Sequence, residues 1–277
     1  MSFVLLLLLF SFYYTNKTID VIKQTDPIMK QLKQNSDKYK VEAKNAKIKD
    51  NKIIPGRKGK EIDYDETYKK MKRYGAYNES LTVFKETDPT VSIENTYDKY
   101  VISGNEEKKS VALVFKVEQN ADIIPISQIL NQENSKATFF IDGLWLENNL
   151  EVAKNLQSHE LEILNYDSKY QEVYFSSALN YLTNVTGKSP KYCYADYDSK
   201  EVIELCSKLK LHTIIPTIKV GNYPYKEIKE KLENASIISL PVNQTTITEL
   251  KTVLDYIKAK GYTLETLDVL LSESMEK

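Results

Sequence analysis

Residues 109–118 read KSVALVFKVE, and residues 136–143 read KATFFIDG. Each stretch contains a short run, 111–115 and 137–141, in which nearly every residue is apolar instead of every second one. A strand that is apolar throughout must be covered on both faces, which a parallel sheet under helices provides. These stretches therefore predict central strands of a parallel α/β sheet.

Similar apolar runs recur further along the chain, with starts 22 to 30 residues apart. They lie at 161–164, 191–194, 213–215, 237–240 and 262–264. Helical patterns separate them; Val202, Leu205, Cys206 and Leu209, for example, share one helix face. Seven strand–helix units predict a distorted (β/α) barrel. A doubly wound open sheet is the alternative, because periodicity alone does not separate the two folds.

Composition restricts the chemistry. The chain has 277 residues, of which 42% are hydrophobic and 28% charged, as in a globular protein. Two Cys and two His exclude a multi-Cys zinc site. Residues 16–60 hold 13 Lys and Arg against 5 Asp and Glu, although the whole chain has a net charge of −1. The folded body is therefore acidic, and we do not expect nucleic acid as a partner.

The N-terminus predicts a membrane attachment. Residues 3–14, FVLLLLLFSFYY, are uncharged, but a spanning helix needs about 20 such residues. No basic residue precedes the run and no cleavage site follows it. We interpret residues 1–15 as an anchor whose beginning lies upstream, with the body outside the cytoplasm. A buried helix is the alternative.

Three further regions follow the predicted anchor. Residues 16–54 predict a basic helical stalk, which either lies near anionic lipid or an anionic wall polymer or is merely solvated. Residues 55–107 predict a small α+β segment, and residues 108–277 the barrel.

Six segments carry a family resemblance: KSVALVFKVE (109–118), KATFFIDG (136–143), SHELEILN (158–165), TGKSPKY (186–192), ASIISLP (235–241) and KGYTLETLDVLL (260–271). In this order they resemble the landmarks of the polysaccharide deacetylase (NodB-homology, carbohydrate esterase) family. The resemblance implies a distorted (β/α) barrel of the glycoside hydrolase/deacetylase type. It also implies removal of acetyl groups from N-acetylated sugars of chitin or peptidoglycan, with a divalent metal held by one Asp and two His.

That chemistry needs a metal to acidify water and a carboxylate to take the proton. The family positions of base and first ligand are Lys116 and Val117 here, and the two His fall at Leu164 and Ser168 or one residue later. Cys193 and Pro241 replace a further Arg and His. The chain therefore resembles a degenerate member, and we predict no catalytic residue, metal or cofactor.

The two remaining histidines do not rebuild the site. His159 and His212 fall at or just before strand starts, whereas barrel catalysis takes place at the carboxyl ends of the strands. His159 matches the structural His of the family's G-H-E segment. For His159 we predict a hydrogen-bonded structural role.

Polar and aromatic residues do follow the predicted strands. The candidate ligand-facing residues are Glu118, Asp142, Trp145, Asp167, Tyr194, Asp196 and Asn243. They predict a sugar site or a hard-cation site built from oxygens; ordinary solvated loops, and helix packing for Trp145, are the alternatives. Cys193 and Cys206 form either a disulfide or two free buried thiols.

Three functions remain open. The first is an extracytoplasmic, membrane-anchored pseudoenzyme that binds cell-wall polysaccharide, peptidoglycan or a partner protein. The second is an active N-acetyl sugar deacetylase whose metal has moved to Glu118, Asp142, Asp167 and Asp196. The third is a structural protein that acts through its basic stalk.

Overall fold

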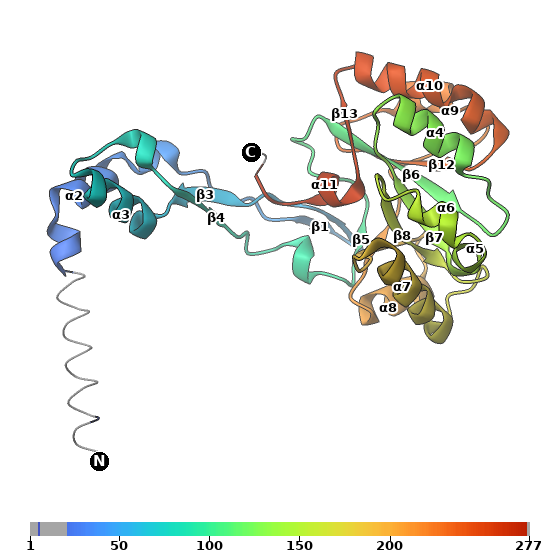
Figure 1. Ribbon diagram of the computed structural model, residues 1–277, viewed down its shortest axis with the longest axis horizontal. Coiled ribbons are helices and arrows are strands. Elements are labelled where there is room, and N and C mark those ends of the chain that lie inside the picture. Colours follow the sequence, from blue (N-terminus) through green and yellow to red (C-terminus); the bar gives the residue numbers. More distant parts are fainter. Residues whose placement is uncertain (1–4, 6–20, 276–277) are drawn as a thin grey trace. The chain divides into compact units, whose positions relative to one another are not determined.

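The computed structural model describes Leu5 and residues 21–275, which divide into two compact units (Figure 1). The smaller unit contains the described residues up to Lys44, Lys58–Pro89 and those from Ser274 onward. The larger unit contains Asn45–Arg57 and Thr90–Glu273. Because the chain passes between the units more than once, the predicted boundaries at 54 and 107 do not coincide with this division. The predicted boundary at 15 lies outside the described residues.

The smaller unit is built on two helices and a hairpin. Helix α2 (Pro27–Asn35) begins with Pro27 at its first position after the N-cap Asp26, and α3 (Tyr64–Tyr74) ends at Gly75 in a left-handed conformation. The two helices pack through Ile28, Met29, Leu32 and Met71. Strands β3 (Gly59–Ile62) and β4 (Phe84–Thr87) pair antiparallel, and 3₁₀ turns lie at Asp37–Tyr39 and Glu79–Leu81.

The predicted helical stalk is only partly helical. After Asn35 the chain turns and forms the hairpin of β1 (Lys47–Lys49) and β2 (Lys52–Ile54). Strand β2 pairs parallel with β5 (Tyr100–Val101), which buries Ile53 completely. Tertiary pairing thus overrides the helix-favouring Lys-rich sequence. Among the described helices, none is long and apolar enough to cross a bilayer; the predicted anchor lies outside the described residues except for Leu5.

The larger unit contains an 11-stranded sheet that includes all seven predicted strands. Besides β1, β2 and β5, the strands are β6 (Ser110–Val117), β7 (Thr138–Asp142), β8 (Glu160–Asn165), β9 (Tyr192–Tyr194), β10 (His212–Ile214), β11 (Ile218–Lys219), β12 (Ile237–Pro241) and β13 (Thr263–Glu265). Their order is β1-β2-β5-β10-β9-β8-β7-β6-β12-β11, with β13 on β6. Every pair except β1–β2 is parallel.

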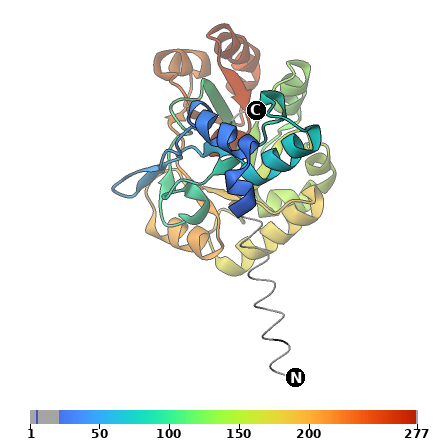
Figure 2. The same ribbon diagram turned by 90° about the vertical axis from the view of Figure 1, so that its left-hand side faces the viewer.

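Helices surround this curled sheet (Figure 2). They are α4 (Ile124–Gln132), α5 (Gly143–Asn148), α6 (Leu150–Lys154), α7 (Glu172–Thr186), α8 (Lys200–Lys208), α9 (Pro224–Lys231), α10 (Gln244–Ala259) and α11 (Leu267–Leu271), with a 3₁₀ turn at Ile93–Asn95. Strand β6 shows the double burial: Leu113 and Phe115 join the larger apolar core with the helices, while Ala112 and Val114 join a second cluster inside the sheet. The continuous apolar run at 111–115 is explained by this arrangement.

The strand order confirms the barrel over the doubly wound sheet. Strands β6 to β10 are neighbours in sequence order, and β11 and β12 follow on the other side of β6, whereas a doubly wound sheet reverses its order at a switch point. In the described chain β5 and β11 do not pair as strands. Thr217 spans this gap: its Oγ1 donates to the Ile102 carbonyl at 2.6 Å and accepts from the Ile237 N–H at 3.1 Å. The barrel is therefore distorted, as predicted.

Candidate functional site

The carboxyl ends of the parallel strands share one edge of the barrel, which we call the mouth. It contains an open cavity of about 400 Å³. The residues that line it are Lys116, Glu118, Gln119, Asn120, Ala121, Ser168, Pro241 and Val242. Most of them come from β6 and the loop after it, with one residue from the β8–α7 loop and two from the end of β12.

Lys116 is the central charged group of the mouth. Its Nζ donates to Asp196 Oδ2 at 2.9 Å and lies 3.6 Å from Glu118 Oε1. The same ammonium is 5.4 Å from the centre of the Tyr194 ring, within the range of a cation–π contact. A fixed positive charge thus stands between two carboxylates and above an aromatic face.

Tyr194 forms a rigid floor beneath this ammonium. Its hydroxyl pairs with Ser239 Oγ at 2.9 Å, and burial raises the pKa of the phenol. The Tyr170 hydroxyl donates to the Tyr194 carbonyl at 3.4 Å, and burial raises the pKa of Tyr170 to about 12. Both phenols are therefore neutral at physiological pH and serve as packing and hydrogen-bonding groups.

The residues at the family's metal positions do not fit a metal. Val117 is fully buried among apolar side chains, and Leu164 is buried inside the barrel. Neither offers a lone pair to a cation, and Ser168 and Pro241 stand on the cavity wall without adding a carboxylate or imidazole. Within the described part of the chain, no three His, Cys, Asp or Glu side chains come together as metal ligands would.

The four carboxylates of the predicted relocated site are not brought together. Asp142 Oδ1 caps α5 by accepting the N–H groups of Leu144 and Trp145 at 2.9 and 3.2 Å, and its Oδ2 accepts the Ser168 N–H at 3.1 Å. Asp142 is also buried, so it is a structural residue. Glu118 and Asp196 do meet, but around an ammonium.

Asp167 has its own partners on the rim. Its two oxygens accept from Gln119 Nε2 at 2.6 Å and Lys169 Nζ at 2.7 Å. Lys169, followed by Gln119, lowers the pKa of this carboxyl. Asp167 therefore fixes the loop after β8 against the loop after β6, where Gln119 lines the cavity.

Two further candidates are structural. The Trp145 indole N–H donates to the Ala121 carbonyl at 2.9 Å and the side chain is buried, so the packing alternative for Trp145 is the correct one. Asn243 is the N-cap of α10, and its side chain accepts the Thr246 N–H at 2.9 Å. Of the seven candidates, Glu118, Tyr194, Asp196 and Asp167 remain at the mouth.

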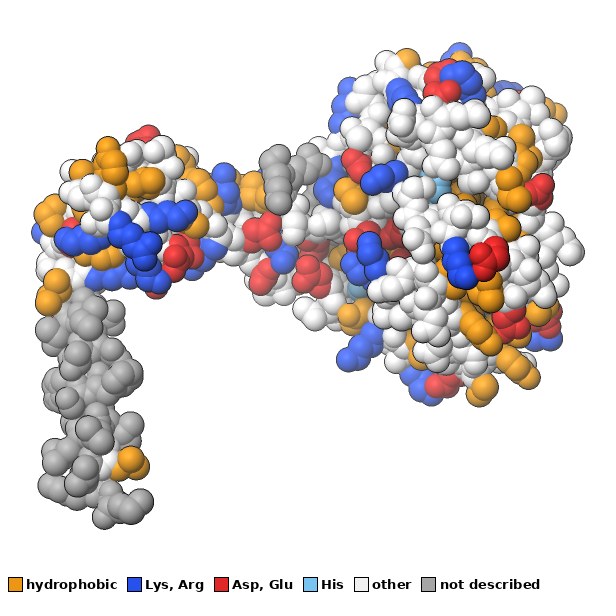
Figure 3. All heavy atoms as spheres, in the orientation of Figure 1, with side chains coloured by type: hydrophobic (Ala, Val, Ile, Leu, Met, Phe, Trp, Pro, Cys, Tyr) orange, Lys and Arg blue, Asp and Glu red, His pale blue; other side chains and the backbone are white. Residues whose placement is uncertain are grey.

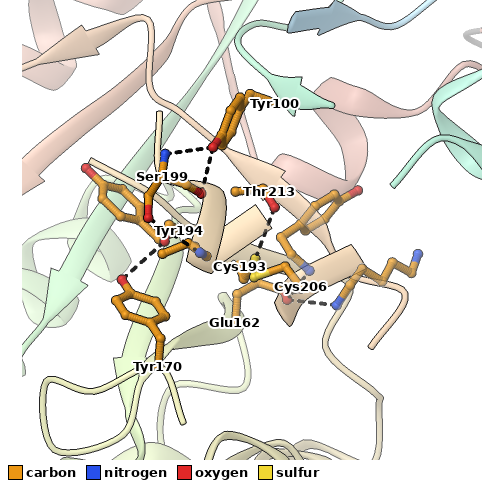
Figure 4. The surroundings of a disulfide bond; sticks show 11 residues. Tyr100, Glu162, Tyr170, Cys193, Tyr194, Ser199, Cys206 and Thr213 are labelled. Carbon is orange, nitrogen blue, oxygen red and sulfur yellow. Dashed lines mark hydrogen bonds between the residues drawn. A yellow bond between two sulfur atoms is a disulfide. The ribbon is translucent and has the colours of Figure 1, made fainter. Parts of the chain in front are cut away.

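Cys193 and Cys206 form a disulfide (Figure 4). Cys193 lies in β9 and Cys206 in α8, and both are fully buried. Thr213 of β10 lies beside the bond, with its Oγ1 3.6 Å from Cys193 Sγ. The bond closes a loop that contains Asp196, the ion-pair partner of Lys116. It therefore attaches this loop to the barrel wall.

Both histidines lie at strand starts, as expected, but the predicted hydrogen bonds of His159 are absent. In the described chain its two ring nitrogens are buried without a hydrogen-bond partner, and the ring meets Phe139 edge-on at 5.3 Å. His212 stacks on Tyr97 at 4.5 Å. Burial lowers the pKa of each imidazole. Both rings therefore favour the neutral form and make aromatic contacts.

The sequence did not predict a role for two glutamates at the same end of the barrel, the buried Glu162 and the half-buried Glu160. Glu162 accepts the N–H groups of Lys191 and Tyr192, each at 2.8 Å, and burial raises its pKa. Burial, followed by the charge of Asp268, raises the pKa of Glu160 to about 7. The acidic residues alternate through ELEIL, a signal of two side chains on the inner face of the barrel.

Comparisons with known proteins show which solved structures resemble this barrel. No protein-family profile matches the sequence. The wild-type BA3943 of Bacillus anthracis, described as a CE4 family pseudoenzyme, superimposes with a TM-score of 0.69 at 22% identity, over 91% of this chain and 97% of that one. The Bc1960 peptidoglycan N-acetylglucosamine deacetylase gives 0.58 at 18% identity, over 64% and 95%.

The chain has the fold of the family 4 carbohydrate esterases. The resemblance to polysaccharide deacetylases predicted from sequence is thus confirmed in the fold. A sequence relative, the uncharacterized protein YlxY of Bacillus subtilis (strain 168), is 28% identical over 93% of this chain and 87% of its own length. A mutant of BA3943 is described as having restored enzymatic activity. The carbohydrate esterase fold therefore occurs in active enzymes and in pseudoenzymes.

Proposed function

We propose that this protein is a catalytically inactive, deacetylase-like protein that binds an N-acetylated cell-wall glycan at the barrel mouth. The observation that carries the proposal is the ion pair of Lys116 with Asp196. A lysine stands at the position of the family's base and is paired with a carboxylate, so residue 116 does not supply a base that takes a proton from water. The mouth thus has a cavity that can hold a ligand, but not the family's base and metal ligands that would cleave the acetyl group from a sugar.

The chemistry of the cavity supports binding of a polar ligand. In the cavity lining, Gln119 and Asn120 offer amide donors and acceptors, and Glu118 offers a carboxylate. Asp196 adds an acceptor next to Lys116. Tyr197, in the loop directly after Asp196, is 74% exposed and presents an aromatic ring. Sugar rings pair hydroxyl and amide edges with apolar faces, which this combination matches.

We also propose that the protein acts outside the cytoplasm, attached through its N-terminal apolar segment. The disulfide between Cys193 and Cys206 supports an oxidising compartment. A C-terminal fusion to alkaline phosphatase, which is active only after export, should be active in cells. An inactive but intact fusion would contradict this location.

One pair of assays separates binding from catalysis. Calorimetry with oligomers of N-acetylglucosamine should show binding, and acetate release from the same oligomers and from peptidoglycan should stay at background with added zinc or cobalt. Asp196→Asn should weaken binding, whereas Glu204→Gln on the outside of α8 should not. Metal-dependent acetate release would overturn the claim of inactivity, and absence of any glycan binding would overturn the claim of function.

A further inference from the structure

We propose that the outer face of α7 is a second part of the glycan site, which binds a sugar chain as it leaves the mouth. This inference rests on the proposed function and extends it to a surface outside the cavity. The surface consists of Tyr166 and the exposed side of α7, and we call it the α7 face. Its residues on the helix are Val173, Tyr174, Ser177, Asn180, Tyr181 and Asn184.

The part of the α7 face that lies on the helix carries no charged side chain. From Val173 to Gly187 the sequence contains no Asp, Glu, Lys or Arg, in a chain of which 28% is charged. Val173, Tyr174 and Tyr181 are 75%, 48% and 41% exposed, and hydrophobic side chains are visible over this helix in Figure 3. Helices α8, α9 and α10 all carry several charged residues. A neutral surface with exposed rings indicates a neutral partner, since any charged group placed there would lose water without gaining a counter-ion.

Two of the three tyrosines, Tyr166 and Tyr174, are held in position. The rings of Tyr166 and Tyr174 are stacked with centroids 5.3 Å apart and planes 17° apart. The Tyr166 hydroxyl donates to the Glu147 carboxylate, with oxygens at 3.1 and 3.2 Å. A ring that is already fixed loses little freedom when a ligand stacks on it, so the aromatic surface is prepared for binding.

The spacing of the rings suits a sugar chain. Tyr174 and Tyr181 are seven residues apart on one helix, which is two turns or about 10.5 Å. This is close to the length of one β-1,4-linked disaccharide, so alternate sugar rings of a chain would meet the two tyrosines. Ser177 and Asn180 lie between them and supply a hydroxyl and an amide for the sugar's polar edges.

The α7 face continues from the mouth along the chain. Ser168 lines the cavity, and Tyr166 precedes it by two residues in the same loop. A backbone hydrogen bond from the Lys169 N–H to the Tyr166 carbonyl, at 2.9 Å, makes this loop a tight turn. Since α7 begins at the end of this loop, the path that we propose for the glycan runs from Ser168 past Tyr166 to the helix.

The experiment measures affinity against glycan length. Calorimetry is performed on the full chain with N-acetylglucosamine oligomers of two and six units, for the wild type and for Tyr174→Ala combined with Tyr181→Ala. Tyr74→Ala, which removes a 64% exposed tyrosine of the smaller unit, is the matched control. Thermal melting shows that each variant is folded, and Tyr181→Phe, which keeps the ring, is the conservative rescue.

We expect the wild type to bind the six-unit oligomer at least tenfold more tightly than the two-unit oligomer. The double variant should lose that gain, about tenfold, while binding the two-unit oligomer as the wild type does. Equal affinity for both lengths, or a double variant identical to the wild type, would overturn this inference and leave the mouth site intact. Absence of binding to either oligomer would instead remove the proposed function itself. A dimer that is lost on Tyr181→Ala would show that α7 is a protein interface, against our proposal.

Discussion

The Nζ of Lys116 lies 2.9 Å from Oδ2 of Asp196, across the mouth of the barrel from β6 to the loop after β9. An ammonium brings its own charge to the place where a metal-dependent deacetylase needs a cation. Unlike a metal it has no coordination position, so it cannot turn a bound water into a hydroxide nucleophile. At the barrel mouth the Asp196 carboxylate is therefore paired with Lys116 and not with a metal.

Replacing Lys116 alone should not create an enzyme. In Lys116→Asp the family's base would return, but Val117, Leu164 and Ser168 would still provide no metal ligands. We expect acetate release with added zinc to stay at the background of the wild type. Any zinc-dependent rate above that of Lys116→Ala would contradict this.

Restoring the family's first metal ligand at position 117 should lower the stability of the fold. Val117 is fully buried between the sheet and the helices, so Val117→Asp places a carboxylate in an apolar region. We expect a loss of roughly 3 kcal/mol in the free energy of unfolding. Urea denaturation measures this loss, and Val117→Thr, which adds a smaller polar group, serves as the milder comparison. A Val117→Asp variant as stable as the wild type would show that the strand end is not closed by packing.

Stability should fall as pH rises through neutrality, because of Glu160. Its pKa is raised from the ordinary 4.5 to about 7, so the folded protein favours the protonated carboxyl more than the unfolded chain does. That contribution is fully present below about pH 4.5 and is lost as pH approaches 7. We expect a decrease on the order of 2 kcal/mol from this group.

Denaturation of the wild type and Glu160→Gln at pH 5 and pH 8 tests this. The glutamine variant should show a smaller difference between the two pH values, since its side chain does not ionise. Glu151→Gln, on the exposed side of α6, should behave as the wild type. Identical pH dependence in wild type and Glu160→Gln would show that Glu160 does not titrate near neutrality.

Loss of the disulfide should destabilise the barrel by about 3 kcal/mol, the value for a closed loop of about this length. The bond spans 13 residues between Cys193 and Cys206. Cys206→Ala should lower the melting temperature, and reducing agent should lower that of the wild type but not that of the variant. If reduction under denaturing conditions left the melting temperature of the wild type unchanged, the disulfide would not be a stabilising bond.

Asp142→Ala should act on stability more than on ligand binding. It removes the cap of α5 and the contact with the Ser168 N–H from a buried position, which we expect to cost about 2 kcal/mol. Asp142→Asn, which keeps one acceptor, should cost less. Unchanged stability with lost glycan binding would show that Asp142 faces the ligand after all.

The sequence predicted the barrel well because its strands are continuous apolar runs. Such a run indicates by itself a strand that is covered on both faces. It also predicted that Lys116 and Val117 replace acids, although only the structure shows that Lys116 is paired. Asp142 and Asn243 were misjudged as ligand-facing because a polar residue after a strand looks the same whether it caps the next helix or faces solvent. The hairpin of β1 and β2 was missed because its pairing with β5 joins residues about fifty positions apart.

That pairing changes how the protein can be dissected. Deletion of residues 16–54, made to test the basic segment, removes β1 and β2 and leaves the edge of β5 bare. A truncation that begins at residue 108 also removes β5 and leaves the edge of β10 bare. Such fragments would present unpaired amide and carbonyl groups and be prone to self-association, so their loss of function would say little about the deleted charges. Charge-reversal at Lys30 in the intact chain would address the basic segment without opening the barrel.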